Sequence, residues 1–289
     1  MKIKFTKMQG CGNDFVILDY CEYEKLGLNM SEAAKKICDR HFGIGADGFI
    51  IPNTKAENAD IGWFFYNSDG TTAQMCGNGM RCFAKYVYDR KLVSSTEFSV
   101  KTLAGIIKPC VLENGLVRVN MSKPILEPEK IPFVPNNNLK YKISVKDRIF
   151  EGNAVSMGNP HFVVFVPDVD ALDLEDLGPQ FEHHKLFPEG VNTEFVQVID
   201  ENTVKFRVWE RGSGETLACG TGACAVAYAC MKLKKAGAMN QPLNVQARGG
   251  LLKVTYDSNS NHIFLQGPAV EVFTGEIEIP DEELNEYKS

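Results

Sequence analysis

A glycine-flanked cysteine motif occurs twice in this chain of 289 residues, and this repeat constrains the fold more than any other feature. The segment Asn67–Ala84 contains Cys76-Gly-Asn-Gly, and the segment Glu210–Ala227 contains Cys219-Gly-Thr-Gly. The two cysteines are 143 residues apart, and so are the first residues of the two segments. Because this period is about half of the chain, the repeat predicts two similar domains rather than a solenoid.

A second, weaker similarity supports the same duplication. Gly12–Ile17 resembles Gly158–Val164, with one inserted residue. A strand-like run also precedes each cysteine motif, Ile61–Tyr66 in the first half and Val204–Trp209 in the second. Each half is therefore predicted to carry its cysteine after a strand and at the start of a helix.

The helices that follow the two motifs are expected at the centres of their domains. The helix after Cys76 extends towards Arg90, and the helix after Cys219 is apolar on almost every side, as expected of a buried helix. Gly237 is the expected end of the second helix. Because strands outnumber helices, we expect an α+β fold of two pseudo-symmetric domains. Each would be a curved, mostly antiparallel sheet wrapped around a central helix, with the active site in the cleft between them.

The domain boundaries follow from the repeat. Residues 1–120 plus 266–289 are expected to form the N-terminal half with Cys76, and residues 121–265 the C-terminal half with Cys219. The run from Lys123 to Asn138 contains several prolines and asparagines, which indicates a linker and loop between the halves. The alternating segment Gly267–Phe273 is expected to return to the first half as a strand.

Charge and hydropathy argue against two classes of partner. The net charge of −6 and the pI of about 5.5 are unlike a nucleic-acid surface, which needs clustered lysine and arginine. The most apolar stretch, Ala223–Met231, is too short to span a bilayer, so no membrane partner is expected. The first residues alternate like a strand and show no signal peptide, which predicts a cytoplasmic location.

The nine cysteines are expected to be reduced in that compartment. None has the Cys-x-x-Cys spacing of a structural zinc site, so no metal is expected. Cys82, Cys224 and Cys230 lie beyond the glycines on the two helices and are expected in the core. Cys11, between two glycines, is expected in a loop near the site.

Cys76 and Cys219 differ from the other cysteines because each precedes a helix. A helix N-terminus presents unpaired N–H groups and partial positive charge, which lower a thiol pKa and can hold a carboxylate. Two such thiols suit the inversion of a carbon centre: one removes a proton from one face and the other delivers a proton to the opposite face. N–H groups around a carboxylate would stabilise the adjoining carbanion. This chemistry needs no metal or organic cofactor.

Structural explanations compete with these functional ones. Either cysteine alone is as well explained as a small buried residue. His161 precedes an apolar strand and could be structural, and Arg211 could be a surface cation. Most asparagines are turn residues, but Asn67 holds the place in the first half that Glu210 holds in the second.

Specific motifs are ordered along nearly the whole chain. Those around the cysteines are Asn67-x-Asp-Gly, Met75-Cys-Gly-Asn-Gly-Met-Arg-Cys82 and Trp209–Ala223. The others are Gly10-x-Gly-Asn-Asp-Phe15, Arg40–Gly48, Gly158-Asn-Pro-His161 and Gly190-Val-Asn192. Together they resemble the diaminopimelate epimerase family. The related proline racemases share the paired cysteines, but usually have histidine where this chain has Asn78.

The resemblance implies interconversion of LL- and meso-diaminopimelate without pyridoxal phosphate or another cofactor, a step towards lysine and, in many bacteria, peptidoglycan. It implies acid/base roles for Cys76 and Cys219. A homodimer is one expectation for the assembly. The remaining implied positions are the carboxylate-holding Gly77, Asn78, Gly220 and Thr221, the substrate-binding Asn13, Asn67, Asn159, Asn192, Glu210 and Arg211, and the cysteine-tuning His161 and Glu210.

The chemistry of diaminopimelate, which has two amino-acid ends, agrees with part of this set. Arg211 can hold a carboxylate with two hydrogen bonds, and asparagines offer donors and acceptors without adding charge. The chain departs from the family at Gly48, where some members have a glutamine that contacts substrate. It also has Thr71 where serine is usual, which should matter little.

Three other functions compete with an epimerase. A second cysteine-pair racemase, such as a proline racemase-like enzyme, would not need Arg211 to hold a distal carboxylate. A metal or redox protein would use the cysteines as ligands, but lacks their usual spacing. A hydrolase with Cys219 and His161 would not explain why the motif occurs twice.

Overall fold

The computed structural model describes residues 2–18, 29–72, 75–135, 137 and 139–278. The chain divides into two compact units. Residues up to Val119 form the first unit together with the segment that begins at Gly267, and residues Asn120–Gln266 form the second. Cys21, the asparagines 136 and 138 of the expected linker, and residues 279–289 of the expected first domain lie outside the described residues.

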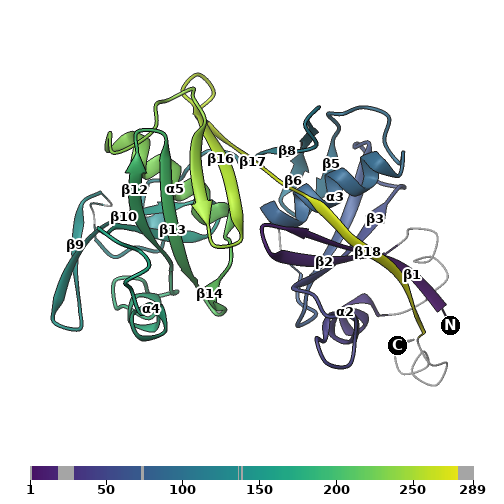
Figure 1. Cartoon of the computed structure of the whole chain (residues 1–289), viewed down its shortest axis with the longest axis horizontal. Coiled ribbons are helices and arrows are strands. Elements are labelled where there is room, and N and C mark those ends of the chain that lie inside the picture. Colours follow the sequence, from purple (N-terminus) through teal and green to yellow (C-terminus); the bar gives the residue numbers. More distant parts are fainter. Residues whose placement is uncertain (1, 19–28, 73–74, 136, 138, 279–289) are drawn as a thin grey trace. The chain divides into compact units, whose positions relative to one another are not determined.

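The first unit consists of a mixed sheet with helices packed on it (Figure 1). Its strand order is β18-β1-β2-β3-β4-β5-β6, and a short β7–β8 hairpin follows β6 in the chain. The bounds are β1 (Lys2–Gly10), β2 (Asn13–Leu18), α2 (Met30–Cys38), β3 (Gly48–Asn53), β4 (Ile61–Asn67), α3 (Gly77–Asp89), β5 (Val100–Thr102), β6 (Gly105–Ile107), β7 (Cys110–Val111), β8 (Val117–Asn120) and β18 (Val270–Glu278).

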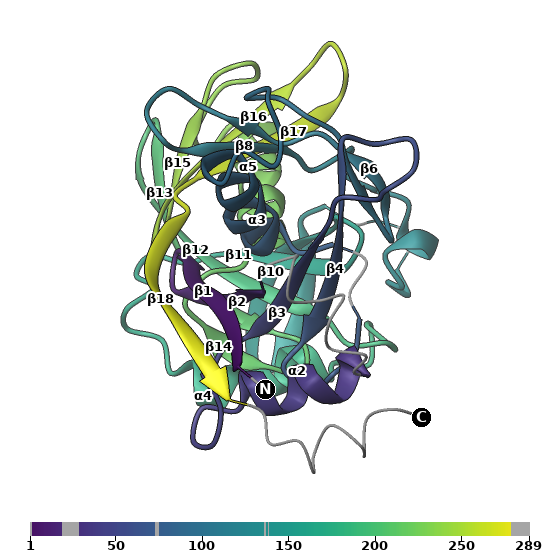
Figure 2. The same ribbon diagram turned by 90° about the vertical axis from the view of Figure 1, so that its right-hand side faces the viewer.

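Two parallel pairs, β2–β3 and β4–β5, interrupt an otherwise antiparallel sheet. A parallel pair needs a crossover connection. The segment with α2 supplies it for the first pair, and the segment with α3 supplies it for the second. β18 arrives from the other end of the chain and runs antiparallel along β1 (Figures 1 and 2), which confirms the predicted return of the C-terminal segment as a strand.

Helices cover both faces of this sheet, which explains why its inner strands are apolar without alternation. Val16 and Phe49 pack in one core with Ala34 and Ile37 of α2. On the opposite face, α3 lies against β1, β2 and β3 (Figure 2). Phe15 and its neighbours on this face are buried between the sheet and α3.

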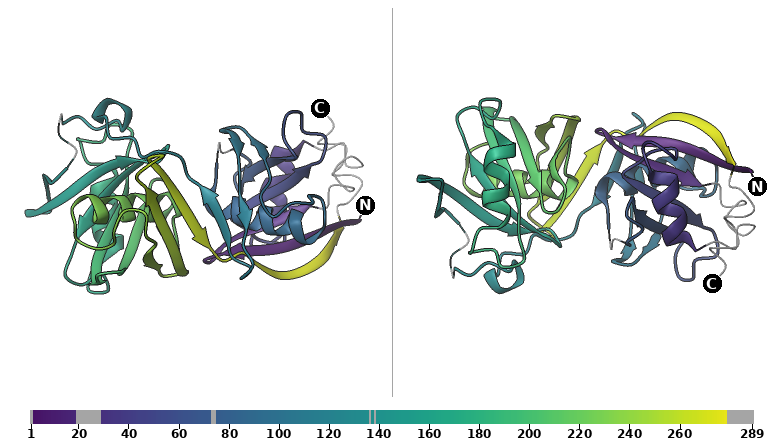
Figure 3. Two further views of the ribbon diagram at one scale, coloured as in Figure 1. Left: turned by 90° about the horizontal axis from the view of Figure 1, so that it is seen from above. Right: turned by 90° about the horizontal axis from the view of Figure 1, so that it is seen from below.

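The second unit contains the longer sheet, seen in green from two further sides in Figure 3. Its strand order is β17-β16-β15-β13-β12-β11-β10-β9, with β14 paired to β13. The bounds are η1 (Pro128–Lys130), β9 (Tyr141–Val145), β10 (Arg148–Ser156), β11 (Pro160–Phe165), α4 (Leu174–Glu182), β12 (Asn192–Asp200), β13 (Thr203–Glu210), β14 (Gly214–Thr216), α5 (Gly220–Lys232), β15 (Leu243–Ala247), β16 (Gly250–Asp257) and β17 (His262–Gly267).

The two units repeat one order of strand directions. The pairs β10–β11, β12–β13 and β15–β16 are antiparallel like β1–β2, β3–β4 and β5–β6. The pairs β11–β12 and β13–β15 are parallel like β2–β3 and β4–β5. α4 occupies the place of α2, and α5 that of α3. The predicted α+β class, with repeated, mostly antiparallel sheet domains, is confirmed.

The core of the second unit is rich in aromatic side chains. Phe162 of β11 packs edge-on against Phe187 and tilted against Phe181 of α4, within a buried cluster that also includes Phe195. α5 lies against β10, β11, β12, β15 and β16, and almost every residue from Gly220 to Met231 is buried. The prediction of a buried second helix is therefore confirmed.

Two local predictions were wrong. The α5 helix ends at Lys232, before Gly237, because Lys234 takes a left-handed conformation with φ of 54° and the chain turns there. The segment after Lys123 is not a simple linker: Ile131 and Phe133 are buried in the core of the second unit. This burial could not be predicted from the sequence, because isolated apolar residues between prolines form no periodic pattern. No helix among the described residues has the length and apolarity to cross a membrane.

Replacing Gly152 by alanine is expected to destabilise the protein by about 1–3 kcal/mol through overpacking. A Cβ on Gly152 would lie 2.3 Å from ring atoms of Phe162, whose own neighbours leave it little room to move. Denaturant unfolding measures the loss. Glu151→Ala, the exposed neighbour on β10, serves as the matched control, and equal stability of the two variants would contradict the packing argument.

Candidate functional site

Each repeated cysteine caps the N-terminus of a central helix with its own sulfur. Cys76 precedes α3, and its Sγ accepts a hydrogen bond from Gly79 N at 3.4 Å. Cys219 precedes α5, and its Sγ accepts from Gly222 N at the same distance of 3.4 Å. A thiol in place of the usual serine or aspartate cap leaves the sulfur directed at the amides of the first helical turn.

The second glycine of each motif is required by close packing. In α5, a Cβ on Gly222 would lie 2.6 Å from Glu194 Oε1 and 3.1 Å from the Cβ of Cys219. In α3, a Cβ on Gly79 would lie 3.3 Å from Phe65 Cε2 and 3.4 Å from Phe15 Cε1. A side chain at Gly222 would displace the Glu194 carboxylate, and one at Gly79 would press on the ring of Phe65, so glycine at both positions keeps the first turn of each helix free of these contacts.

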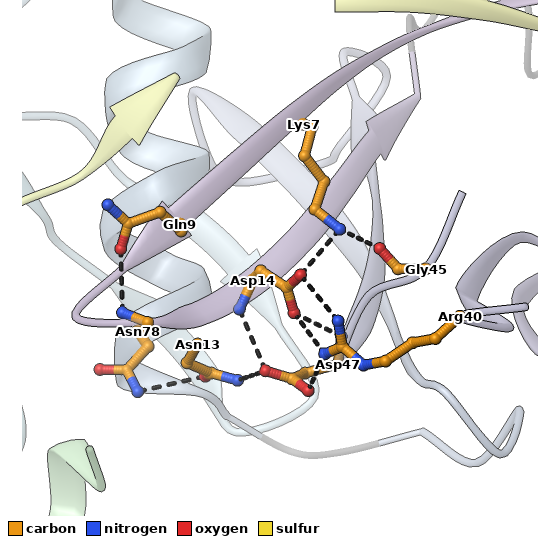
Figure 4. Close-up of polar contacts among 9 residues, drawn as sticks. Lys7, Gln9, Asn13, Asp14, Arg40, Gly45, Asp47 and Asn78 are labelled. Atoms are coloured by element: carbon orange, nitrogen blue, oxygen red, sulfur yellow. Dashed lines mark hydrogen bonds and ion pairs between the residues drawn. The ribbon is translucent and has the colours of Figure 1, made fainter. Parts of the chain in front are cut away.

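In the first unit, the start of β2 and the start of α3 meet around Cys76. Asn13 Oδ1 accepts from Asn78 Nδ2 at 3.1 Å and from Cys76 Sγ at 3.9 Å. Asn13 Nδ2 donates to Asp47 Oδ2 at 2.6 Å (Figure 4). Asn78 also accepts from Arg81, which is fully buried, at 2.9 Å. The predicted Asn13, Cys76, Gly77 and Asn78 are therefore brought together.

Asn67 lies at the same end of the sheet, as the last residue of β4. It pairs across the sheet with Gly48, and its Nδ2 donates to Thr71 Oγ1 at 2.9 Å. A Cβ on Gly48 would lie 3.1 Å from Phe65 and from the carbonyl oxygen of Tyr66, so the backbone here leaves little room for a side chain. The predicted Asn67 is thus placed on the strand that leads to the cysteine motif.

In the second unit, a buried histidine and glutamate lie beneath the start of α5. His161 Nδ1 is 2.7 Å from Glu194 Oε1, and His161 Nε2 is 2.9 Å from Asn159 Oδ1. Both side chains are completely buried, and Glu194 Oε2 has no hydrogen-bond partner among the described residues. Because Asn159 offers an oxygen to Nε2, Nε2 donates and one proton is held between Nδ1 and the carboxylate.

Asn192 and Arg211 are connected through the backbone. Asn192 Nδ2 donates to Pro160 O at 2.8 Å, and its Oδ1 accepts from Arg211 N at 2.9 Å. Arg211 Nη1 donates to Glu189 O at 2.8 Å. β11 and β12 are parallel and pair His161 with Asn192, so these two residues lie side by side at the same end of the two strands.

The remaining predicted residues of this unit lie at the end of β13 and the start of α5. Glu210 Oε1 accepts from Thr216 Oγ1. Thr221 Oγ1 is 3.4 Å from Cys219 Sγ. Gly220 is the first residue of α5. The structure therefore brings Asn13 to Cys76 and brings Thr221 and Glu210 to Cys219, while Asn67, Asn192 and Arg211 lie on the strands and loops of the same two units.

The electrostatics around Cys219 differ from the sequence expectation. Burial raises the pKa of the Cys219 thiol well above its usual range, and the carboxylates of Glu210 and Glu194 raise it further. Hydrogen bonds from Thr221 and Gly222 oppose this shift but do not outweigh it. The helix amide of Gly222 thus lowers the pKa of this thiol as expected, but the expected net lowering is wrong, because burial and nearby negative charge dominate.

Glu194 is the member of the site that sequence reasoning missed. Burial raises the pKa of its carboxyl, against a lowering by His161, while Glu210 raises it further. One signal was available in the sequence: an acidic residue inside an apolar strand, two positions after Asn192 and so on the same face.

Other features of the described residues do not add to the site. A surface cavity of about 550 Å³ lies over β3, β4 and β5, lined by Trp63, Phe64 and Leu103 among others, and none of the predicted site residues lines it. No group of three or more histidine, cysteine, aspartate or glutamate side chains in the described part of the chain could hold a metal ion. Cys11 lies in the β1–β2 turn, where its sulfur accepts from Arg81 at 3.9 Å.

Comparison with known proteins identifies similar chains. The family model described as diaminopimelate epimerase matches residues 5–127 and 153–272. The diaminopimelate epimerase of Agathobacter rectalis is 49% identical, over 96% of this chain and 100% of that protein. That of Acetivibrio thermocellus is 46% identical over 96% and 99%, and one from Methanococcus maripaludis is 45% identical over 96% and 100%.

Solved structures share the fold at low identity. A phenazine biosynthesis protein of the PhzF family from Bacillus anthracis superposes with a TM-score of 0.68 at 21% identity, covering 96% of this chain and 100% of that one. A probable proline racemase from Agrobacterium radiobacter gives 0.68 at 12% identity, covering 98% and 95%. At these identities the likeness concerns the fold alone.

Replacing Glu210 by glutamine is expected to make Cys219 reactive at lower pH. The change removes a negative charge that raises the pKa of this thiol, so the thiolate forms earlier as the pH rises. Alkylation by iodoacetamide across a pH series, read by site-resolved mass spectrometry in a Cys76→Ala background, measures the midpoint.

The control is Glu201→Gln, an exposed glutamate in the turn before β13. It should leave the Cys219 midpoint in place. A folded Glu210→Gln protein with an unchanged midpoint would show that this carboxylate does not act on the sulfur.

Proposed function

The chain belongs to the diaminopimelate epimerase family, and from this premise we propose that it interconverts LL- and meso-diaminopimelate, with Cys76 and Cys219 as acid and base. The observation that carries the proposal is the repeated cap: in both units a cysteine sulfur accepts from the third amide of a buried helix. Two equivalent thiols on equivalent helices match a reaction whose forward and reverse directions exchange the acid and the base.

The proton balance of the proposed reaction is simple. The thiolate of one cysteine takes the α-proton, and the electron pair of the broken C–H bond stays on the α-carbon. The thiol of the other cysteine then gives its proton to the opposite face. The substrate is inverted and the charge on the enzyme has moved from one sulfur to the other, so the product complex is ready for the reverse reaction. This requires the two sulfurs to approach one carbon from opposite sides.

The first helical turns supply the groups that stabilise the carbanion. In α3 the amide of Gly79 bonds to the sulfur, and that of Met80 begins the helical ladder. The amides before them belong to Gly77 and Asn78, and in α5 to Gly220 and Thr221. We assign these amides to the α-carboxylate, where they would meet the negative charge that spreads onto it as the proton leaves.

We assign binding of the distal amino-acid end of the substrate to polar residues of both units. Arg211 uses one N–H for Glu189 O and has others for a carboxylate. Asn67, Asn159 and Asn192 offer amide groups, and Glu210 a carboxylate for an ammonium group. Asn13 is also assigned to the substrate.

His161 and Glu210 are assigned to tuning Cys219, together with Glu194. Because Glu194 is buried against Gly222, its charge acts on the first turn of α5 at short range. A high proton affinity at Cys219 suits its role as the acid, and its role as base then requires the substrate to be close.

A proline racemase-like activity is the alternative. The relatives at 45–49% identity over 96% of the chain are diaminopimelate epimerases, whereas the probable proline racemase at 12% identity shares the fold alone.

We also propose a cytoplasmic location and a homodimer. All eight described cysteines are free thiols, which agrees with a reducing compartment. Light scattering would test the homodimer.

The test of the substrate is conversion of LL-diaminopimelate by the purified, reduced protein, followed by chiral chromatography. We expect the meso isomer to appear until the two forms reach equilibrium. Folded protein that converts proline but leaves LL-diaminopimelate unchanged would overturn the assignment in favour of the alternative.

Replacing either Cys76 or Cys219 by alanine is expected to lower kcat for epimerisation by about a thousandfold or more, because each removes one of two required proton carriers. Circular dichroism should show an intact fold. Cys230→Ala, a buried thiol on α5, is the matched control and should retain activity. Normal turnover by either single variant would contradict the two-base mechanism.

A further inference from the structure

A network of four charged residues joins the loop before β3 to the β1–β2 hairpin (Figure 4). Arg40 Nη2 and Nη1 donate to the two oxygens of Asp14 at 2.8 and 3.2 Å, and Arg40 Nη2 also donates to Asp47 Oδ1 at 2.7 Å. Lys7 Nζ lies 2.8 Å from Asp14 Oδ2 and donates to the carbonyl of Gly45. The cations Lys7 and Arg40 thus hold the carboxylates of Asp14 and Asp47 beside the β1–β2 hairpin.

Backbone amides tighten the same network. Asp14 N donates to Asp47 Oδ2 at 3.1 Å, and Asp47 N donates to Asp14 Oδ1 at 3.1 Å. Burial alone would raise the pKa of Asp14, but hydrogen bonds from Arg40 and Lys7 outweigh it and lower the pKa to about 2. The position of the Asp47 carboxylate is therefore set by Arg40 on one side and by the backbone of Asp14 on the other.

The Asp47 carboxylate determines the orientation of the side-chain amide of Asn13. Asp47 Oδ2 lies 2.6 Å from Asn13 Nδ2. A carboxylate can only accept hydrogen bonds, so the amide must direct its NH₂ group at Asp47 and its oxygen away from it. That oxygen faces Asn78 Nδ2 at 3.1 Å and Cys76 Sγ at 3.9 Å. Because an amide oxygen only accepts, the sulfur facing it must donate.

We propose that Asp47 is a positioning residue for the acid/base chemistry: it fixes the amide of Asn13 so that an oxygen, and never an N–H, faces Cys76, and so favours the protonated form of that cysteine. The inference rests on the proposed function for its consequence in turnover. Its structural basis is the fixed direction of three successive hydrogen bonds, from Cys76 to Asn13 and from Asn13 and Arg40 to Asp47.

The fixed direction of these hydrogen bonds helps to match the proton affinities of Cys76 and Cys219. Cys219 holds its proton tightly because it is buried beside two carboxylates. A reversible two-base reaction is most efficient when the two thiols have similar proton affinity, because each must act as acid in one direction and as base in the other. An acceptor facing Cys76 raises its proton affinity towards that of Cys219. A reversed Asn13 amide would instead donate to the Cys76 thiolate, lower the proton affinity of Cys76 and so increase its difference from that of Cys219.

Other charged and titratable groups lie in the part of the first unit that contains Cys76. They are not altered when Asp47 alone is changed. Asp47→Asn also removes one negative charge, which by itself would lower the midpoint, so the midpoints are compared at about 1 M salt, where a Debye length of about 3 Å screens this Coulomb effect and the direction of the hydrogen bond remains. Among the described residues, Cys82 on α3 interacts electrostatically with Cys76, Arg81, Cys11 and Asp14, and Asp14 pairs in turn with Lys7 and Arg40.

The variant Asp47→Asn tests the proposal. Asparagine has nearly the same shape but can both donate and accept, so it no longer dictates the direction of Asn13. The pH midpoint for alkylation of Cys76, measured by site-resolved mass spectrometry in a Cys219→Ala background, is expected to fall by roughly one unit, the effect of exchanging one ordinary hydrogen bond. In the otherwise native enzyme, kcat is expected to fall about tenfold with KM nearly unchanged.

Two further variants make the result decisive. Asp60→Asn changes a carboxylate that accepts from Ser99 in the same unit, and should leave both the midpoint and kcat unchanged. The exchange Asn13→Asp with Asp47→Asn again allows only an oxygen to face Cys76, so the midpoint should return to the native value or rise above it. If Asp47→Asn misfolds by circular dichroism, the exchanged pair still tests the orientation.

An unchanged Cys76 midpoint in folded Asp47→Asn would overturn the proposal, and so would a midpoint that stays low in the exchanged pair. The alkylation measurement needs no substrate. Failure of this inference is therefore distinguishable from failure of the proposed function, which would appear as native protein that does not act on LL-diaminopimelate.

Discussion

The sulfur caps of α3 and α5 are the contacts on which the rest of each unit depends. Each cysteine caps a buried helix, and the glycine three positions on avoids a close contact with the side chains packed against the first helical turn. The cap directs the sulfur and the first amides of the helix to the same place. The proposed proton transfer and carboxylate binding would then both depend on a single local structure, formed twice in one chain.

Burial of these helices has a chemical consequence. A helix N-terminus favours a thiolate, but Cys219 is 4% exposed and lies beside two carboxylates, and these effects dominate. The sheet supplies one of those carboxylates, because alternation along β12 directs Glu194 to the α5 face and Phe195 to the aromatic core. The same strand therefore serves both the stability of the second unit and the chemistry of its sulfur.

Much of this could be predicted from the sequence because the signals were local or repeated. The offset between the two motifs predicted the duplication, and the period of two in Gly267–Phe273 predicted the returning strand. Ile131 and Phe133 could not be placed, since only the tertiary structure shows that they pack with Phe162. Glu194 and the orientation of Asn13 were missed for the same reason: their partners, His161 and Asp47, are 33 and 34 residues away.

We propose that each sulfur serves one face of the same substrate carbon. The most direct measurement is the early reaction of LL-diaminopimelate in deuterated water, with the isotope at the α-carbon read separately in product and in remaining substrate. We predict that the first meso product carries solvent deuterium at the inverted carbon while the remaining LL isomer keeps its proton, because a second group delivers the new hydrogen. Meso product that retains the original proton would mean that one base returns what it removed, and would contradict the account.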